Sequence, residues 1–433
     1  METPESQRRI VVVGASLGGL RAAEQLRAAG WGGEIVVVGD EPHMPYNRPP
    51  LSKAQLAAPG TAEEAHAALA FRPRRSATGI EWRLGSAVAS ADLAAGTVTM
   101  ADGGSLAFDG LVVATGLRPA RVAAPGPLAG RHVVRSLGDA LGLRAELVPG
   151  ARVVVVGAGF IGCEVAATAV GLGCEVTLVE GSSGPMERSV GGQLSAGVRE
   201  LLRSRGVECL PGVRVAEFLA VGARASGTHD GARCGGVRLT DGLVVATDVV
   251  VEAVGSDANV EWLEGNGLDL GDGVLCDASM RALGAVAPGD SELAAPVARG
   301  RVVAVGDVAR YPDRITGGPA RRVEHWATPT DTAKLAAPAL VAALRGTEAP
   351  EAEAPLPSFW TDLFGLRIQG VGSPGLADEV EVLEGDPARP ADGVAVAYRR
   401  EGRLIGTVTG AIPADRHLTY RQAVLDELRG VPA

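Results

Sequence analysis

Two segments of the chain repeat the same order of elements, and this repeat constrains the fold more than any other feature. The segment 10–41 begins with an apolar run that predicts a strand, continues with a glycine-rich turn and an alanine-rich helix, and ends with a second apolar run closed by acids. The segment 153–180 repeats this order. Each segment predicts a βαβ unit, so the chain is expected to be an α/β protein with two Rossmann-like parallel sheets.

The second turn has the complete Gly-x-Gly-x-x-Gly spacing. Its residues are Gly157, Ala158, Gly159, Phe160, Ile161 and Gly162. Glycines at these positions allow a tight turn and let the backbone approach a pyrophosphate, which the free amides at the start of the helix attract. The turn therefore predicts a dinucleotide site. Phe160 is either an aromatic near the path of a nicotinamide or part of the core behind the turn.

The first turn departs from this spacing at one position. Its residues are Gly14, Ala15, Ser16, Leu17, Gly18 and Gly19. On spacing alone, this copy is either a working site or a degenerate one that binds nothing. The small side chain of Ser16 still permits close approach of a phosphate, and the complete strand, turn, helix, strand and acid order favours a working site.

An acid follows the second strand of each unit. Asp40 stands 26 residues after Gly14, and Glu180 stands 23 residues after Gly157. Both spacings are near the roughly 20 residues at which an acid accepts from a ribose hydroxyl. Residues 181–184 contain no arginine to neutralise a 2′-phosphate, so we expect NADH rather than NADPH, although Arg188 leaves this choice open.

Two dinucleotide sites in one chain suggest FAD together with a nicotinamide nucleotide, because hydride transfer needs the two rings held together. The runs 111–116 and 302–307 predict strands followed by turns, where the chain would leave and re-enter a flavin-binding half. Asp307 follows the later strand and a glycine. It is placed either to reach a hydroxyl of FAD or to cap the following turn.

Composition excludes several other classes of protein. Of the 433 residues, 46% are hydrophobic and 21% are charged, as in ordinary globular chains, and the net charge of -10 has the wrong sign for nucleic acid or an anionic membrane. The sequence contains no signal-peptide pattern and no membrane-length apolar run, so we expect a cytoplasmic protein. We also expect a monomer or weak homodimer. The five cysteines and six histidines lack metal-ligand spacing, which predicts buried thiols and no metal.

A set of motifs outside the two turns completes a family pattern. The motifs are Arg48-Pro-Pro-Leu-Ser-Lys53, Ala114-Thr115-Gly116-Leu-Arg118-Pro, Val305-Gly-Asp307, Val323-Glu-His-Trp326 and Ser358-Phe-Trp-Thr-Asp362, together with Glu164 just after the second turn. From about residue 8 to the C-terminus, the chain resembles the FAD-dependent, NADH-dependent ferredoxin reductases. These serve haem-thiolate monooxygenases and Rieske oxygenases.

The resemblance implies a glutathione-reductase-like layout of three domains. An FAD domain would comprise 1–120 and 253–350, an NAD domain would be inserted at 121–252, and a smaller C-terminal α+β domain would occupy 351–433. The sequence independently predicts antiparallel strands in the last domain, at Leu366–Val371, Val394–Tyr398 and Leu404–Val408. The stretches 118–150 and 346–357, rich in Pro, Gly, Ala and Glu, are expected to be crossings or linkers.

The resemblance also assigns roles to individual residues. Asp40 would hold the adenosine ribose of FAD, and Arg48 and Lys53 would reach its phosphates and isoalloxazine ring. Arg135 and Asp307 would contact the rest of FAD, and Trp326 would lie beside the ring. The remaining residues implied to bind one of the two cofactors are Val88, Ala114, Thr115, Gly116, Ile161 and Gly255.

Lys53 and Glu164 are the predicted catalytic pair. In similar proteins a lysine and a glutamate at these places meet near flavin N5 and the nicotinamide. The cation would stabilise the anionic reduced flavin, and the glutamate would position the carboxamide. The alternative is a solvated lysine and an ordinary acid in the first turn of a helix, where the dipole favours it.

The implied reaction takes electrons from NADH through FAD to a 2Fe–2S or similar ferredoxin, which would feed a monooxygenase or a Rieske oxygenase. A local positive patch would suit an acidic ferredoxin, and its candidate residues are Arg310, Arg314, Arg321, Arg322 and Lys334; alternatively, these are scattered surface cations. Three other functions stay open: an NADH oxidase, a flavoprotein that tailors a natural product, and a redox-sensing interaction protein of the apoptosis-inducing-factor type. A flavin disulfide reductase is disfavoured because no cysteine precedes Cys163.

Overall fold

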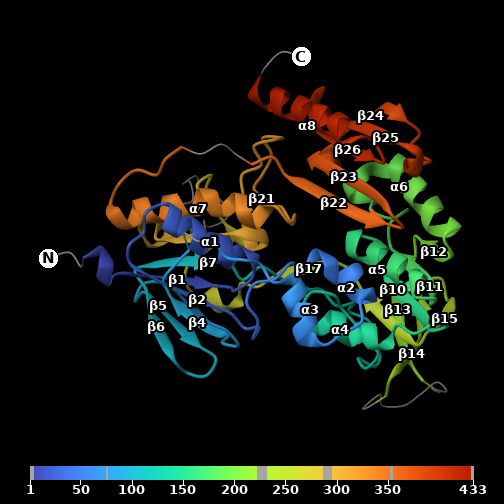
Figure 1. The fold of residues 1–433 in the computed structure, drawn as a ribbon, viewed down its shortest axis with the longest axis horizontal. Helices are drawn as coiled ribbons and strands as arrows, with labels where there is room; N and C mark the ends of the chain where they lie inside the picture. Colours follow the sequence, from blue (N-terminus) through green and yellow to red (C-terminus); the bar gives the residue numbers. More distant parts are fainter. Residues whose placement is uncertain (1–3, 75–76, 222–231, 286–294, 352–354, 431–433) are drawn as a thin grey trace. The chain divides into compact units, whose positions relative to one another are not determined.

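The two predicted repeats form parallel sheets in two separate compact units. The computed structural model describes residues 4–74, 77–221, 232–285, 295–351 and 355–430 (Figure 1). The first unit comprises Met1–Asn47, Ala68–Arg118 and Asp257–Pro357, and the second comprises Arg48–Ala67, Pro119–Ser256 and Ser358–Ala433. Each repeat lies wholly within one unit, and the α/β prediction is confirmed.

The first unit is built on a five-stranded parallel sheet in the order β19-β7-β1-β2-β3. Its strands are β1 Arg9–Val13, β2 Glu34–Val38, β3 Ile80–Arg83, β7 Gly110–Val113 and β19 Val302–Ala304. Ile10 and Val12 pack into one hydrophobic cluster and Val11 and Val13 into another, because successive side chains of a strand point to opposite faces. Both faces of this sheet are therefore buried, which explains its continuous apolar strands.

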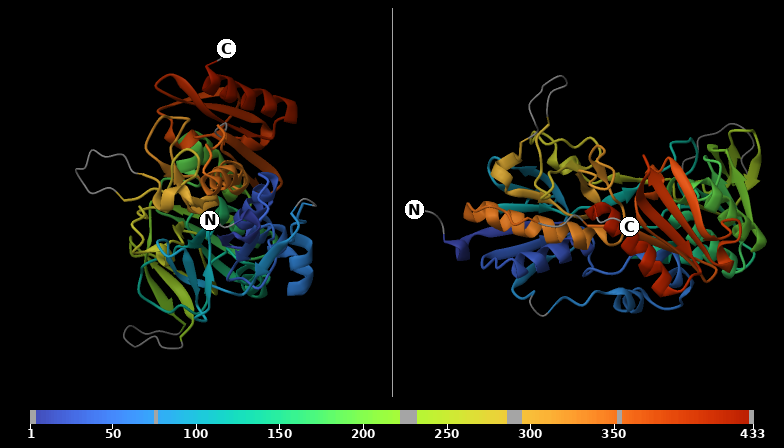
Figure 2. Two further views of the ribbon diagram at one scale, coloured as in Figure 1. Left: turned by 90° about the vertical axis from the view of Figure 1, so that its left-hand side faces the viewer. Right: turned by 90° about the horizontal axis from the view of Figure 1, so that it is seen from above.

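Helices cover one face of this sheet and a second sheet covers the other (Figures 1 and 2). Helices α1 Leu17–Ala28 and α7 Thr328–Arg345 lie side by side. The antiparallel strands opposite are β4 Val88–Asp92, β5 Thr97–Met100 and β6 Ser105–Ala107. A further small sheet of this unit contains β18 Val274–Leu275, β20 Ala309–Tyr311 and β21 Arg321–Arg322.

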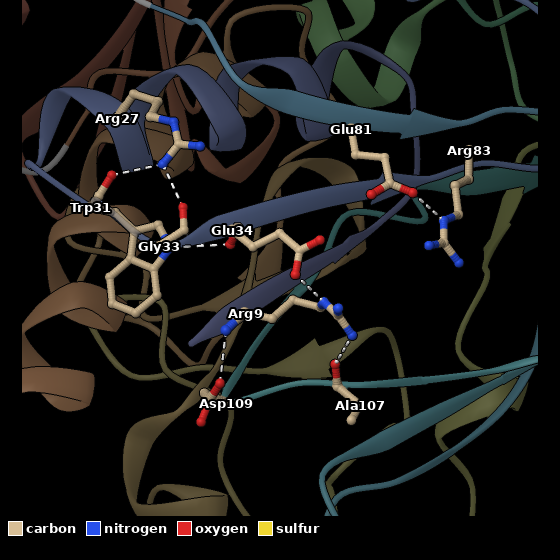
Figure 3. Close-up of polar contacts among 9 residues, drawn as sticks. All are labelled: Arg9, Arg27, Trp31, Gly33, Glu34, Glu81, Arg83, Ala107 and Asp109. Atoms are coloured by element: carbon tan, nitrogen blue, oxygen red, sulfur yellow. Dashed lines mark hydrogen bonds and ion pairs between the residues drawn. The ribbon is translucent and has the colours of Figure 1, made fainter. Parts of the chain in front are cut away.

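Polar contacts fasten the amino ends of the parallel strands in the first unit (Figure 3). The backbone N–H of Arg9 donates to Asp109 Oδ2 at 2.7 Å, and Arg9 Nε donates to Glu34 Oε2 at 2.6 Å. Arg27 Nη1 donates to the carbonyl of Gly33 at 2.8 Å. These contacts lie at the amino end of the sheet. The glycine turn lies at the opposite, carboxyl end.

The second unit contains its own five-stranded parallel sheet in the order β12-β11-β10-β16-β9. Its strands are β9 Arg131–His132, β10 Arg152–Val156, β11 Glu175–Glu180, β12 Val207–Pro211 and β16 Val249–Glu252. The helices that connect these strands are α5 Phe160–Gly171 and α6 Glu187–Ser204. An antiparallel sheet of β13 Val215–Ala220, β14 Cys234–Leu239 and β15 Val244–Ala246 completes this part of the unit.

The C-terminal part of the second unit is a five-stranded antiparallel sheet in the order β22-β23-β26-β25-β24. Its strands are β22 Ser358–Leu363, β23 Leu366–Gly372, β24 Glu379–Gly385, β25 Val394–Arg400 and β26 Arg403–Gly410. Helix α8 Ala414–Arg429 lies across this sheet and packs on β26 (Figure 2). The three predicted strands correspond to β23, β25 and β26, and are confirmed.

The stretch 118–150 is more ordered than a linker. It contains β9 and helix α4 Leu137–Glu146, which begins with a reciprocal capping box between Ser136 and Asp139. Further short elements include α2 Ala54–Ala57, α3 Ala62–Leu69, and β8 Leu117–Pro119 paired with β17 Ser256–Ala258. Within the described residues, no helix combines the length and apolarity that a bilayer span requires.

Candidate functional site

The second glycine turn has the backbone of a dinucleotide site. Gly157 follows β10 with φ +97°, and a Cβ there would lie 2.3 Å from the carbonyl oxygen of Ala253. A Cβ on Gly162 would lie 1.9 Å from the carbonyl oxygen of Gly157, so the helix start packs directly on the turn.

The same turn fits a phosphate group. Helix α5 begins after Gly159, which supplies no side-chain cap, so the first amides of the helix are available to an anion. A Cβ on Gly159 would meet no described atom within 4 Å, and the same is true of Gly255, a predicted site residue with φ +120°. Open space beside uncapped helix amides is what a pyrophosphate requires.

Glu180 lies beside this turn, at the end of β11. Its Oε2 accepts from the backbone N–H of Ala158 at 2.6 Å, and its Oε1 accepts from that of Ser182 at 2.8 Å. Both carboxylate oxygens are therefore oriented by the backbone on either side of the strand end. The half-buried side chain is fixed where the acid of a dinucleotide site meets a ribose.

The first glycine turn has the same backbone form. Gly14 has φ +115°, and a Cβ there would lie 2.1 Å from the carbonyl oxygen of Ala114. Helix α1 begins after Ser16, and the nearest atom to a Cβ on Gly18 would be at 3.5 Å, an ordinary contact. The residues at the start of α1 therefore leave this turn able to receive a phosphate group, as in the second copy.

Asp40 does not occupy the place in the first copy that Glu180 occupies in the second. The amide of Gly14 donates to the carbonyl of Val38, and the amide of Gly157 donates to that of Val179. Gly39 is therefore the counterpart of Glu180, and Asp40 follows one residue later as an exposed side chain. Its Oδ1 accepts from the backbone N–H of Glu41 at 2.9 Å.

Glu41 was not predicted as a site residue. It is half-buried, and its Oε2 accepts from Tyr46 Oη at 2.5 Å.

Other predicted residues of the first unit lie at the ends of its central strands. Ala114 and Thr115 follow β7, where Thr115 Oγ1 donates to the carbonyl of Asn259 at 2.7 Å, and Gly116 has φ +62°. Asp307 is half-buried in a short 3-10 helix directly after β19. Val88 begins β4 and packs against the hydrophobic cluster of this unit.

Trp326 is 41% exposed, and its Nε1–H donates to Asn47 Oδ1 at 2.9 Å. Asn47 directly precedes the Arg-Pro-Pro motif, and its amide oxygen serves as the acceptor that orients the indole. Burial lowers the pKa of the neighbouring His325 to about 4, and Arg321 adds to this shift, so His325 is neutral at pH 7.

Lys53 and Glu164 are in contact within the second unit. Lys53 Nζ lies 2.7 Å from Glu164 Oε1, and the side chains are 20% and 5% exposed respectively. Glu164 also accepts from Ser52 Oγ on Oε2 at 2.6 Å and from Thr361 Oγ1 on Oε1 at 2.8 Å. The alternative of a solvated lysine and an isolated helix acid does not fit this geometry.

Two hydroxyl residues hold Glu164, and neither Ser52 nor Thr361 was predicted as a site residue. Both lie inside motifs of the family pattern, Pro-Pro-Leu-Ser-Lys and Ser-Phe-Trp-Thr-Asp. Thr361 comes from β22 of the C-terminal sheet, so this sheet helps to position the carboxylate. Thr168 on α5 fixes the Ser52 backbone by donating to its carbonyl at 2.9 Å.

The remaining predicted residues of the second unit lie at the starts of several of its helices. Arg48 Nη1 donates to the carbonyl of Arg135 at 2.6 Å, which brings this pair together. Phe160 is half-buried, and its ring centroid lies 5.2 Å from that of Phe359. Ile161 is 45% exposed, and Arg188 is exposed in the first turn of α6.

The five cations proposed as a positive patch are largely balanced by acids. Arg310 pairs with Asp269, Arg321 with Asp313 and Lys334 with Asp331, and Arg322 pairs with both Asp272 and Glu324. This geometry favours scattered, paired cations over a concentrated positive field.

The cysteines do not provide a reactive thiolate. All five are buried free thiols. Burial raises the pKa of Cys163 well above its usual value, and the nearby Cys209 and Glu164 raise it further. A thiol in this state is a poor nucleophile at neutral pH, so Cys163 is a core residue.

Comparisons with known proteins agree with this geometry. A model of the pyridine nucleotide-disulphide oxidoreductase family matches residues 8–328. The probable ferredoxin reductase CtmF of Castellaniella defragrans is 35% identical over 431 residues, which is 97% of this chain and 95% of the relative. The ferredoxin–NAD(+) reductase component of the p-cumate 2,3-dioxygenase system of Pseudomonas putida is 36% identical over 383 residues, which is 88% and 85% of the two chains.

A solved structure shares the fold over nearly the whole chain. The reductase in the covalent complex of putidaredoxin reductase with putidaredoxin matches with a TM-score of 0.82 and 29% identity, and the match covers 98% of this chain and 94% of that one. Since the family model spans most of the chain and the relatives are similar from end to end, the chain belongs to the pyridine nucleotide-disulphide oxidoreductase family, among its ferredoxin reductases.

Proposed function

We propose that this chain is an FAD-containing, NADH-dependent ferredoxin reductase. It passes electrons to a 2Fe–2S or similar ferredoxin that feeds a haem-thiolate monooxygenase or a Rieske oxygenase, and it acts in the cytoplasm. The observation that carries the proposal is the presence of two dinucleotide turns with matching backbone in one chain, at Gly14 and Gly157. The names of the relatives support the acceptor, since they are components of ferredoxin-dependent oxygenase systems.

The proposed domains follow the sheets. FAD binds to 1–120 and 253–350, NADH binds to 121–252, and 351–433 forms the C-terminal domain. Each of the three five-stranded sheets lies within one of these divisions, which supports the assignment.

The protein's own residues bind, orient and balance charge. Bound FAD supplies the chemistry, because it accepts two electrons from NADH and releases them one at a time. The first turn holds FAD, and Asp40, one residue beyond the counterpart of Glu180, holds its adenosine ribose, with Arg48, Arg135, Asp307 and Trp326 as further contacts. The second turn and Glu180 hold NADH.

Lys53 and Glu164 act as a unit in this proposal. Ser52 and Thr361 hold the Glu164 carboxylate on both oxygens, so that it orients Lys53 and the nicotinamide carboxamide without moving. The Lys53 ammonium supports the negative charge that develops on the reduced ring. No side chain of this arrangement serves as a nucleophile.

The test is single-turnover reduction of the FAD-loaded protein by NADH, followed by mixing with ferredoxins of oxygenase systems. Lys53→Met is expected to slow flavin reduction by about 10²-fold, the usual effect of removing one preorganised charge at a reacting centre. The matched control is Lys334→Gln, because the only other lysine of the chain lies exposed in an ion pair with Asp331. This control should reduce its flavin at the wild-type rate.

Three results would contradict the proposal. Equal rates of flavin reduction for Lys53→Met and the wild type would show that Lys53 and Glu164 are not a catalytic pair. A flavin that NADH reduces but no one-electron carrier reoxidises, with a change in oligomeric state on reduction, would favour an interaction protein of the apoptosis-inducing-factor type. Rapid reoxidation by oxygen alone would favour an NADH oxidase.

A further inference from the structure

Arg214 lies against the residue that follows Glu180, although 34 positions separate it from Glu180 in the sequence. A Cβ built on Gly181 would lie 2.7 Å from Arg214 Nε and 3.2 Å from its Cγ. The side chain therefore runs over the bare backbone at Gly181. Any larger residue at 181 would displace it.

The backbone before Arg214 is fastened to the loop after β11. The amide of Gly212 donates to the carbonyl of Ser182 at 2.9 Å, and the amide of Val213 donates to that of Glu180 at 3.2 Å. On the other side, the amide of Arg214 donates to Thr240 Oγ1 at 3.2 Å. Arg214 is therefore held in place beside Glu180 by hydrogen bonds from both directions.

The charge of Arg214 is not balanced by an acid in the described part of the chain. Arg214 is exposed, and none of the described carboxylates comes within ion-pair distance of its guanidinium. Glu180 is the nearby acid, and the backbone amides of Ala158 and Ser182 orient its carboxylate. By contrast, Arg238 and Arg152 of the same unit pair with Glu217 and Asp248.

An acid at the end of this strand meets the adenosine ribose, and an arginine nearby is what accommodates a 2′-phosphate. We propose that Arg214 is the residue that faces the 2′ position of the bound nucleotide, in opposition to Glu180. Glu180 favours the 2′-hydroxyl of NADH and repels a phosphate. Arg214 provides a cation, able to bind a phosphate with two parallel N–H groups, that gives this chain a latent site for NADPH. The inference rests on the proposed binding of NADH at the second turn.

The test measures binding of adenosine 2′,5′-bisphosphate and adenosine 5′-monophosphate to the full-length, FAD-loaded protein by calorimetry, with competition against NADH for weak binders. Glu180→Gln removes the repulsion, and it is expected to tighten the bisphosphate at least about 10-fold. Adding Arg214→Gln to that variant should reverse most of the gain. Binding of the monophosphate should tighten in no variant, because it lacks the 2′-phosphate, and Glu180→Gln should weaken it, because Glu180 accepts from the ribose hydroxyl.

Two further variants separate Arg214 from other cations. Arg400→Gln, an exposed arginine at the end of β25, makes the same change of charge elsewhere and should leave both ligands unaffected. Arg188→Gln tests the other arginine near the predicted 2′ position. Steady-state rates should agree with binding, with the NADPH to NADH ratio of kcat/KM rising in Glu180→Gln and falling again in the double variant.

The outcomes distinguish this inference from the proposed function. If Glu180→Gln binds the bisphosphate no more tightly than the monophosphate, or if Arg188→Gln and not Arg214→Gln removes the gain, the inference is overturned while NADH reduction stands. If neither adenosine phosphate binds and NADH does not reduce the flavin, the second turn is not a nucleotide site, and the proposed function falls together with the inference.

Discussion

The two glycine turns have the same backbone conformation and differ in the side chains around them. A Cβ on Gly19 would lie 1.9 Å from the carbonyl of Gly14, and a Cβ on Gly162 would lie 1.9 Å from that of Gly157. The carbonyls of Ala114 and Ala253 press against the first glycines of the two turns in the same way. Close backbone contact therefore defines both turns, which leaves the neighbouring side chains free to differ.

The differences lie at the ends of the flanking strands. Gly39 is the counterpart of Glu180. A Cβ on Gly39 would lie 2.3 Å from the Cβ of Ala15, so the first copy has no room for an acid at this position. Val113 pairs with Val13, whereas its counterpart Glu252 pairs with Val156. The second copy thus has an acid at the ends of two strands, Glu180 and Glu252. The counterpart positions of the first copy, Gly39 and Val113, have none.

The largest effect is expected from replacing Glu252 with valine, the residue at the counterpart position 113 of the first copy. This carboxylate is fully buried, and it accepts from Arg131 at 3.0 and 2.9 Å, from Arg121 at 2.8 Å and from the amide of Val122 at 2.7 Å. Glu252→Val would leave Arg131 buried without its partner. We expect a loss of about 3–5 kcal/mol in free energy of unfolding, measured by denaturant titration.

The control for this change is Glu34→Val, which removes an exposed carboxylate of the first unit. It should cost less than about 1 kcal/mol, as surface ion pairs do. If Glu252→Val were no more destabilising than this control, the cluster around Glu252 would not stabilise the second unit.

Glu252 also gives a pH dependence that Val113 cannot give. Burial alone would raise the pKa of Glu252, but the hydrogen bonds from Arg131 and Arg121 outweigh burial and hold it below the ordinary value of 4.5. Because the folded-state pKa is lowered, its contribution to stability is present above about pH 4.5 and is lost as the pH falls through the folded-state value. Glu252→Gln should therefore flatten the loss of melting temperature below pH 4.5, whereas an unchanged slope would contradict this assignment.

The next effect tests the shared backbone. Gly19→Ala and Gly162→Ala each place a methyl group against a carbonyl oxygen, and each should cost about 1–3 kcal/mol and weaken nucleotide retention. Gly159→Ala is the control, because its Cβ meets no described atom within 4 Å. It should fold with wild-type stability. If thermal melting showed Gly159→Ala to be as unstable as Gly162→Ala, close contact with a carbonyl oxygen would not explain the loss of stability in Gly162→Ala.

The smallest effect on stability is expected from exchanging the residues that differ inside the turns. Ser16→Gly and Gly159→Ser should each change the free energy of unfolding by less than about 1 kcal/mol, because neither position is closely packed by the backbone. Gly159→Ser should weaken NADH by less than about 3-fold, since a serine at the counterpart position 16 still permits close approach of a phosphate. Ser16→Gly should retain FAD fully. Loss of FAD from Ser16→Gly would show that the serine hydroxyl is itself a ligand.

The sequence predicted the features that depend on local order. The strands, the turns and the antiparallel C-terminal sheet follow from apolar periodicity and glycine spacing, which act over a few residues. The helix α4 was missed because its composition resembles a linker, although the capping box of Ser136 and Asp139 was a readable signal.

The site was less predictable because its contacts join distant positions. Ser52 and Glu164 are separated by 112 residues, and Thr361 and Glu164 by 197. The contact between Lys53 and Glu164 was expected only through the family pattern, and Arg214 was not expected at all. The position of Asp40 relative to the first glycine turn could not be predicted, because a shift of one residue along the chain is invisible until the strands are paired.

In the proposed function the first turn holds FAD, and NADH bound at the second turn reduces it. The most direct measurement is an anaerobic titration of the FAD-loaded protein with NADH, followed by visible absorbance and repeated with NADPH. The account predicts that the flavin bleaches at about one equivalent of NADH and far more slowly with NADPH, because one two-electron donor reduces one flavin. A protein that takes up no FAD, or whose flavin responds to neither nucleotide, would contradict it.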